Sequence, residues 1–164
     1  MKKFLSLILL VLLIIVYGIF ALGSGSEGEK TNQGSGVAQA DEENSNLGEF
    51  QVDIVSCRLA KSYDEKPVVI VKYKFTNNSE KPTAFYTAFD DEVYQNGVGL
   101  NGAYVLKENA NYSSDNQTKD IKKGASLDVE VAYELNDTTT DIEVEVKEFF
   151  SFDDSTVKKT FSIK

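Results

Sequence analysis

The chain has 164 residues and a formal net charge of -9, with 26 Asp and Glu against 17 Lys and Arg. An acidic chain without a basic patch argues against nucleic-acid binding, because Lys and Arg side chains that neutralise phosphates drive that binding. The sequence has no His, which removes the commonest general base and zinc ligand, and its single Cys excludes an intramolecular disulfide.

Residues 1–22 are predicted to be a signal peptide or a membrane anchor. Lys2 and Lys3 precede residues 4–22, a run of 19 residues without charge. Signal-peptide cores are about 7–15 residues long and membrane spans about 20, so the run favours a hydrophobic helix that anchors the chain in the membrane. A signal peptide cleaved before Ser24 is the alternative. Both predict an extracytoplasmic protein, either membrane-anchored or secreted, because the positive N-terminus stays inside.

Residues 23–48 are predicted to be a flexible polar linker. They consist mainly of Gly, Ser, Asn, Gln and acidic residues, and Val37 and Leu47 are their only branched apolar residues. So little apolar surface cannot offset the entropy of ordering, and we therefore expect a disordered tether. As a random coil it would span roughly 25–30 Å, which suits a domain held just off a membrane.

Residues 49–164 are predicted to form one folded domain made of strands, because apolar residues recur with a period of two. The alternation that begins at Phe50 slips by one residue between Ile54 and Val55. The slip predicts either a β-bulge or a strand that passes from one sheet to the other. Cys57, at an apolar position of this strand, is expected to be a buried small residue rather than a reactive thiol.

The middle of the domain holds the strongest strand and the least regular stretch. PVVIVKYKFTNNSEKP (67–82) reads as a strand that ends in a turn, and TAFYTAFDDEVY (83–94) as a strand with aromatic residues on both faces. Asn96-Gly97 predicts a hairpin, because both central residues of such a turn adopt positive φ. Residues 101–119 are polar and show no clear period beyond Ala103 to Leu106.

Acidic residues occupy almost every second position of the C-terminal half. The residues expected to face inward alternate with them: Leu127, Val129, Val131, Tyr133, Leu135, Ile142, Val144, Val146, Val157, Phe161 and Ile163. One buried face and one wet face are ordinary for antiparallel sheets, so we expect solvated acids that discourage association between sheet edges. The predicted fold is all-β: an immunoglobulin-like antiparallel β-sandwich of seven or eight strands, preceded by an N-terminal hydrophobic helix and a disordered linker.

Two acidic pairs are the candidate metal ligands: Asp90 with Asp91, and Asp153 with Asp154. Calcium needs six to eight convergent oxygens, which adjacent acids alone cannot supply, and no D-x-D-x-D-G pattern occurs. A serine nucleophile would lack its His. We therefore expect no enzyme and no cofactor, with a calcium-dependent module or a small carboxylate-based hydrolase at the cell envelope as the alternative.

Four tyrosines are the candidate ligand-binding residues: Tyr86, Tyr94, Tyr104 and Tyr112. Exposed Tyr beside loops rich in Asn and Ser is typical of recognition surfaces, although core packing and ordinary loop positions also account for such tyrosines. The resulting hypothesis is an extracytoplasmic binding or interaction module. Its partner would be a protein or a cell-envelope component, met through the loops near residues 85–118.

Four stretches carry a resemblance to a known family: VVIVKYKFTNNSEKPTAF, FDDEVYQNGVGL, IKKGASLDVEVAYELND and FFSFDD. Together they resemble the uncharacterised immunoglobulin-like domains exported by low-GC Gram-positive bacteria, whose architecture is similar to that of the mycobacterial immunoprotective extracellular antigen. The resemblance covers residues 49–164 and implies a fold, because the family has no established activity. The chain departs from lipoprotein relatives because it lacks the Cys that would follow the hydrophobic run and receive the lipid.

Overall fold

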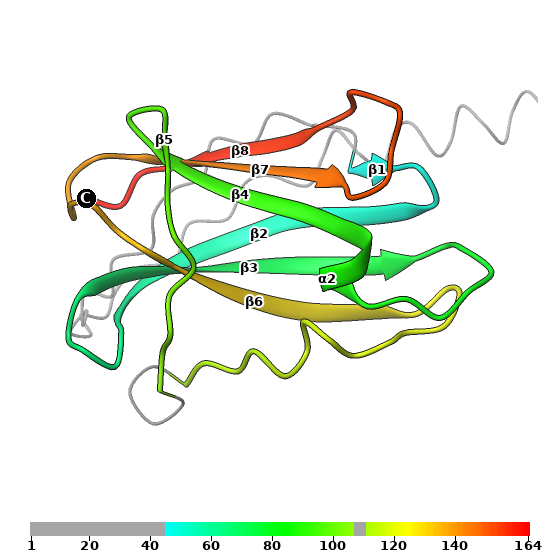
Figure 1. The fold of residues 1–164 in the computed structure, drawn as a ribbon, viewed down its shortest axis with the longest axis horizontal. Helices are drawn as coiled ribbons and strands as arrows, with labels where there is room; N and C mark the ends of the chain where they lie inside the picture. Colours follow the sequence, from blue (N-terminus) through cyan, green and yellow to red (C-terminus); the bar gives the residue numbers. More distant parts are fainter. Residues whose placement is uncertain (1–44, 107–110) are drawn as a thin grey trace, which may run out of the picture. The chain divides into compact units, whose positions relative to one another are not determined.

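The computed structural model describes residues 45–106 and 111–164 (Figure 1). The predictions for residues 1–22, and those for the linker up to residue 44, lie outside these ranges. Within them, no helix is long and apolar enough to cross a membrane.

The described residues form two antiparallel sheets of four strands each, which confirms the prediction of an all-β fold with seven or eight strands. The first sheet has the order β1 (Asn46–Leu47), β2 (Phe50–Lys61), β3 (Pro67–Asn77), β6 (Ser126–Glu134). The second has the order β5 (Val98–Gly99), β4 (Phe89–Gln95), β7 (Ile142–Glu148), β8 (Val157–Phe161). Pairing begins at Asn46, so the folded part starts before the predicted boundary at Glu49.

The main core lies between the two sheets. Leu47 from β1 is buried in it, and so is nearly every residue that the period of two assigned to the inside of β6, β7 and β8. Strand β3 contributes Tyr73 and Phe75, whose rings pack against Phe85. The C-terminal alternation therefore translates directly into a buried face.

A second, smaller core covers the outer face of the first sheet. Val68 and Ile70 of β3 and Ala132 of β6 pack there against Val105 and Tyr112. These last two residues flank the undescribed residues 107–110, in the stretch that has no sequence period. Strand β3 is therefore buried on both faces, which explains its continuous apolar run.

The phase slip in β2 is a β-bulge. The pairing with β3 shifts between Ile54 and Ser56, and the strand continues in the same sheet, so the alternative of a sheet-switching strand is wrong. Lys159 of β8 donates to the carbonyl oxygen of Ile54 at 2.8 Å. One edge of the first sheet is thereby joined to the neighbouring edge of the second.

The stretch predicted as a strand over 83–94 begins with a short helix. Helix α2 spans Phe85–Ala88, and β4 starts at Phe89. A spacing of four between Phe85 and Phe89 fits one helical turn as well as two strand repeats, and their rings pack 5.4 Å apart. The hairpin prediction is confirmed, because Asn96 and Gly97 have φ of 51° and 72°.

Candidate functional site

Tyr104 lies in an exposed aromatic pair. Its side chain is 71% exposed and meets that of Tyr63, which is 63% exposed, with ring centroids 6.1 Å apart in an edge-to-face arrangement. The backbone N–H of Tyr63 donates to the carbonyl oxygen of Tyr104 at 3.0 Å, so the two loops hold each other. Sequence reasoning missed Tyr63, although an aromatic residue in the polar turn between two strong strands was a usable signal.

Tyr86 and Tyr94 lie apart from this pair. Tyr86 is exposed on α2. Tyr94 projects from the outer face of the second sheet, where its hydroxyl donates to the Glu92 carboxylate at 2.5 Å. That hydrogen bond, with a smaller contribution from burial, raises the pKa of Tyr94 to about 12.

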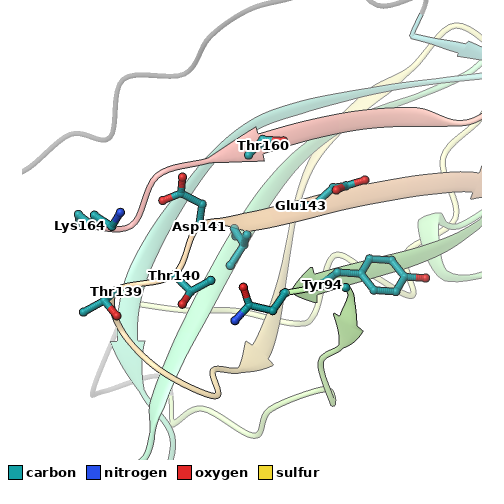
Figure 2. Close-up of a pocket in the computed structure, with 10 residues that line it drawn as sticks. Tyr94, Thr139, Thr140, Asp141, Glu143, Thr160 and Lys164 are labelled. Carbon is teal, nitrogen blue, oxygen red and sulfur yellow. The ribbon is translucent and has the colours of Figure 1, made fainter.

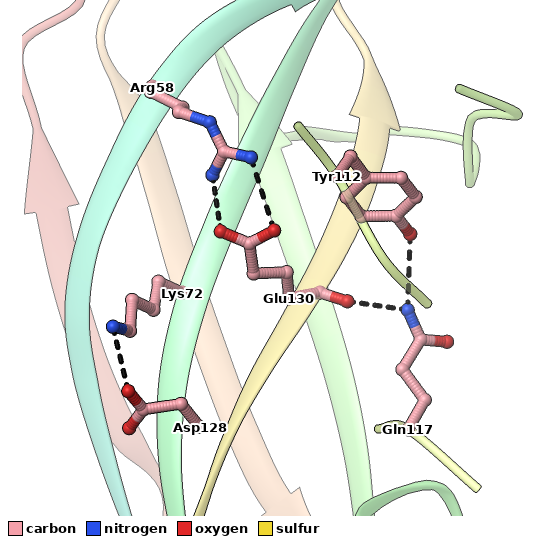
Figure 3. Close-up of polar contacts among 6 residues, drawn as sticks. All are labelled: Arg58, Lys72, Tyr112, Gln117, Asp128 and Glu130. Atoms are coloured by element: carbon pink, nitrogen blue, oxygen red, sulfur yellow. Dashed lines mark hydrogen bonds and ion pairs between the residues drawn. The ribbon is translucent and has the colours of Figure 1, made fainter. Parts of the chain in front are cut away.

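Tyr112 is buried, so the expectation of an exposed side chain there is wrong. It is 7% exposed, because its ring covers the outer face of β3 and β6. Gln117 donates both to the Tyr112 hydroxyl at 3.2 Å and to the carbonyl oxygen of Glu130 at 2.6 Å (Figure 3). Burial raises the pKa of the Tyr112 phenol. Tyr112 is thus part of the packing that fixes the loop.

The acids of β6 meet basic side chains of neighbouring strands, as their predicted solvated positions allow. Arg58 makes two hydrogen bonds to the Glu130 carboxylate, of 2.5 and 3.1 Å, and Lys72 lies 2.8 Å from Asp128 (Figure 3). All four side chains keep access to solvent. Exposed pairs of this kind contribute little to stability, and they leave no converging set of carboxylates on this face.

An open pocket of about 650 Å³ lies where the β4–β5 turn, the β6–β7 turn and the end of β8 meet (Figure 2). Tyr94 lies at one side, and the remaining polar lining includes Asn96, Thr139, Thr140, Asp141, Glu143 and Thr160. Hydroxyl, amide and carboxylate groups of this mixture donate and accept hydrogen bonds, so the pocket suits a small polar group.

The β6–β7 turn that forms this pocket is held by two side chains. The Asp137 carboxylate accepts hydrogen bonds from the backbone N–H groups of Thr139 and Thr140, which lower its pKa to about 2. The buried amide of Gln95 donates to the carbonyl oxygens of Asp137 and Thr140. The pocket rim therefore has a defined shape.

The predicted acidic pairs do not assemble into a metal site. Asp90 and Asp91 are adjacent on β4 and point to opposite faces, so their carboxylates do not converge. The carboxylate of Asp153 accepts hydrogen bonds from the backbone and hydroxyl of Ser155, at 2.8 and 2.6 Å. Among residues 45–106 and 111–164, no group of three His, Cys, Asp or Glu side chains is placed to hold a metal ion.

Asp91 instead takes part in a polar cluster inside the sandwich. The Tyr133 hydroxyl donates to its carboxylate across the two sheets. Burial is the main cause that raises the pKa of Asp91, and burial also raises the pKa values of Tyr133 and Tyr73. Tyr73 Oη is the one buried side-chain oxygen or nitrogen of the described residues that lacks a hydrogen-bond partner. Sequence reasoning missed this cluster.

The β7–β8 loop exposes three phenylalanines, Phe149, Phe150 and Phe152, which we call the Phe loop. The rings of Phe149 and Phe150 pack edge-to-face with centroids 4.7 Å apart. Sequence reasoning used FFSFDD as a stretch that carries the family resemblance and did not predict the exposure of its rings. The density of phenylalanines beside two acids was the available signal that these rings could not all enter the core.

The family model named domain of unknown function (DUF5067) matches residues 26–148 of the chain. The chain belongs to the DUF5067 family. The expected resemblance to an uncharacterised family is thereby confirmed, and the match extends into the stretch predicted as a linker. No curated protein matches this DUF5067 sequence.

Two solved structures are similar to the DUF5067 chain. One is a proposed lipoprotein from Staphylococcus aureus subsp. aureus NCTC 8325, with a TM-score of 0.58 and 17% identity over 78% of this chain and 93% of that one. The other is a protein from Enterococcus faecalis solved by NMR, with a TM-score of 0.56 and 17% identity over 78% of this chain and 94% of that one. At this identity the similarity shows that they share the fold.

Proposed function

We propose that this DUF5067 chain is a non-catalytic binding module outside the cytoplasmic membrane, whose partner is a protein or a cell-envelope component. The apolar run at residues 4–22 supports export, with the chain anchored or secreted. The similar Staphylococcus aureus protein is described as a proposed lipoprotein, which is a kind of protein held at the outer side of a membrane. Because no Cys directly follows the apolar run here, the anchor would be the peptide itself.

An immunoglobulin-like connectivity is part of this proposal. In an immunoglobulin fold, strands A, B and E pair in one sheet and strands C, F and G in the other. The pairing of β2 with β3, of β3 with β6, of β4 with β7 and of β7 with β8 follows that order if β2 is strand A. Domains of this architecture commonly present loops at their two ends for recognition.

The observation that carries the proposal is the exposed pair of Tyr63 and Tyr104. Tyrosine gives large contact area at a low cost in side-chain entropy, because it has only two rotatable side-chain bonds. Here a backbone hydrogen bond and the ring contact already order both residues before any ligand arrives. Binding therefore loses little further entropy, which is how a preorganised surface gains affinity.

The polar pocket extends the proposed binding end. The turn that carries Tyr63 lies at the same end of the sandwich as the β6–β7 turn, because Leu135 donates its backbone N–H to the carbonyl oxygen of Pro67 at 3.0 Å. A ligand that contacts the tyrosine pair thus has hydroxyl and amide groups of the pocket at the same end. This combination supports a ligand with both an apolar face and polar groups.

The test is site-specific photo-crosslinking on intact cells. A photoreactive amino acid at position 63 should give one discrete crosslinked product, and Tyr104→Ala should remove that product while the melting temperature stays unchanged. The same amino acid at Glu80, an exposed position between β3 and α2, is the control. A product that survives Tyr104→Ala, or that forms equally from position 80, would show that the pair is not the binding surface.

A further inference from the structure

The Phe loop exposes more apolar surface than any packing requirement explains. Phe150 is 83% exposed, and Phe152 is fully exposed. The loop is nevertheless tied down at its start, because the backbone N–H of Phe149 donates to the carbonyl oxygen of Ala88 at 2.9 Å. Three exposed phenyl rings on one loop, two of them in contact, mark an interaction site.

The chain segment that leads towards residues 4–22 joins the domain beside this loop. Strand β1, near the start of the described residues, lies next to the loop that connects β7 to β8 (Figure 1). Gly48 has φ of +58°, and a Cβ there would collide with the carboxylate of Glu148, the last residue of β7. The Phe loop therefore lies beside β1, the strand that follows the predicted tether in the sequence.

We propose that Phe149, Phe150 and Phe152 insert into the headgroup region of the membrane that holds this chain. The inference rests on the anchored form of the proposed function. Residues 23–44, which separate the apolar run from the domain, would span roughly 25 Å as a polar coil. That length keeps the membrane surface at a high effective concentration around the loop, so weak insertion is sufficient to orient the domain.

The size of the cluster favours a bilayer over a second copy of the chain. Three Phe side chains bury at most about 750 Å², since one aromatic side chain buries about 150–250 Å². A stable interface between proteins needs roughly 800 Å² per partner. A tethered domain, by contrast, needs only a few inserted rings to hold its orientation, because the anchor already provides attachment.

The charges around the loop predict how the insertion behaves. The loop continues into Asp153 and Asp154, whose negative charges oppose attraction to anionic headgroups. Asp153 uses its carboxylate to fix the turn at Ser155. Insertion driven by burial of phenyl rings should therefore be insensitive to salt and no stronger on anionic lipid than on zwitterionic lipid.

Insertion would also fix which end of the domain faces outward. Strand β7 begins at Ile142, beside the polar pocket, and ends at Glu148, before the Phe loop. A strand of seven residues is about 20 Å long. Membrane contact through the Phe loop thus leaves the proposed binding end directed away from the lipid.

The sequence contains no Trp, so one introduced Trp is the sole indole reporter. The full chain carrying Phe150→Trp is reconstituted into vesicles of phosphatidylcholine with brominated acyl chains, with and without phosphatidylglycerol. Its fluorescence should fall strongly relative to vesicles of unbrominated lipid, in both lipid mixtures and at high salt. Tyr104→Trp, at an aromatic position of the other end that is also largely exposed, is the matched control and should keep its fluorescence.

Sedimentation with the vesicles separates the two proposals. If the chain sediments and Phe150→Trp is quenched while Tyr104→Trp is not, the insertion is supported. If the chain sediments but both reporters are quenched equally, or neither is, the anchor stands and the insertion is overturned. If the chain stays in solution, the anchored form and the insertion both fail. Phe152→Trp repeats the measurement at a second exposed position, so one poorly tolerated substitution cannot decide the result.

Discussion

The side-chain amide of Gln95 donates a hydrogen bond of 2.9 Å to the carbonyl oxygen of Thr140, across the gap between β4 and the β6–β7 turn. The same side chain accepts the backbone N–H of Asn136 at 2.9 Å, and it is 1% exposed. One buried amide thus provides hydrogen-bond partners for backbone groups of the β6–β7 turn. These bonds fix the position of the turn at the rim of the polar pocket.

Gln95→Ala should destabilise the domain by about 2–3 kcal/mol, because it leaves several buried backbone groups without partners. Chemical denaturation measures this difference. Asn78→Ala is the control: the same amide group, exposed just after β3, should change stability by no more than about 0.5 kcal/mol. Equal effects of the two substitutions would contradict the role assigned to Gln95.

Asp91 should make stability depend on pH. Its pKa is raised in the folded state, chiefly by burial, so its contribution to stability is present below the unfolded pKa of about 3.9 and is lost as pH rises through the folded value. Asp91→Asn removes this loss and keeps an acceptor for Tyr133. The variant should therefore gain stability over the native chain as pH rises from about 3 to 7. Denaturation across that range checks the prediction, with Asp90→Asn, on the exposed face of β4, as the matched control. A difference in unfolding free energy between Asp91→Asn and the native chain that does not change with pH would contradict it.

Cys57 should react slowly with alkylating reagents in the folded protein. Burial raises the pKa of its thiol to about 11, and the nearby Lys159 lowers the pKa by a smaller amount. At pH 8 only about one thiol in a thousand is then ionised, and the thiolate is the reactive form. Iodoacetamide labelling followed by mass spectrometry should be slow in buffer and fast in denaturant. Rapid labelling of the native chain would mean that the strand opens at the bulge.

Tyr112→Ala should destabilise the domain much more than Tyr104→Ala. Removing the buried ring of Tyr112 uncovers Val68 and Ile70, which should cost about 2–3 kcal/mol of unfolding free energy. Removing the exposed ring of Tyr104 should cost no more than about 0.5 kcal/mol. Thermal or urea unfolding of the two variants side by side tests the assignment of one tyrosine to packing and of the other to the surface.

Local patterns predict local structure well in this chain. The alternation at 142–146 and the hairpin at Asn96-Gly97 depend on neighbouring residues, and the structure has both. The continuous apolar run from Val68 to Val71 also signals burial on two faces, but its second cover comes from a polar stretch with no period. Nothing in the local sequence around Tyr112 indicates that it covers β3, because a contact between segments far apart decides it.

The candidate site was harder to predict for the same reason. Asp91 differs from Asp90 only in its strand register, and register decides which of two adjacent acids turns inward. Phenylalanine is a typical core residue. The three phenylalanines of the Phe loop are exposed only because the loop lies beyond the end of β7. Composition identifies the residues available for a site, and topology determines which of them meet.

The bulge in β2 has a consequence for how such domains behave when many share one surface. A regular outer strand would present a row of unpaired backbone groups on which a neighbouring chain could add. Here the ammonium group of Lys159 already occupies the carbonyl oxygens of Ile54 and Val55, at 2.8 and 3.4 Å. These carbonyl oxygens are therefore not free to pair with a strand of a second chain. Crowded copies of the domain should not form fibres through this stretch.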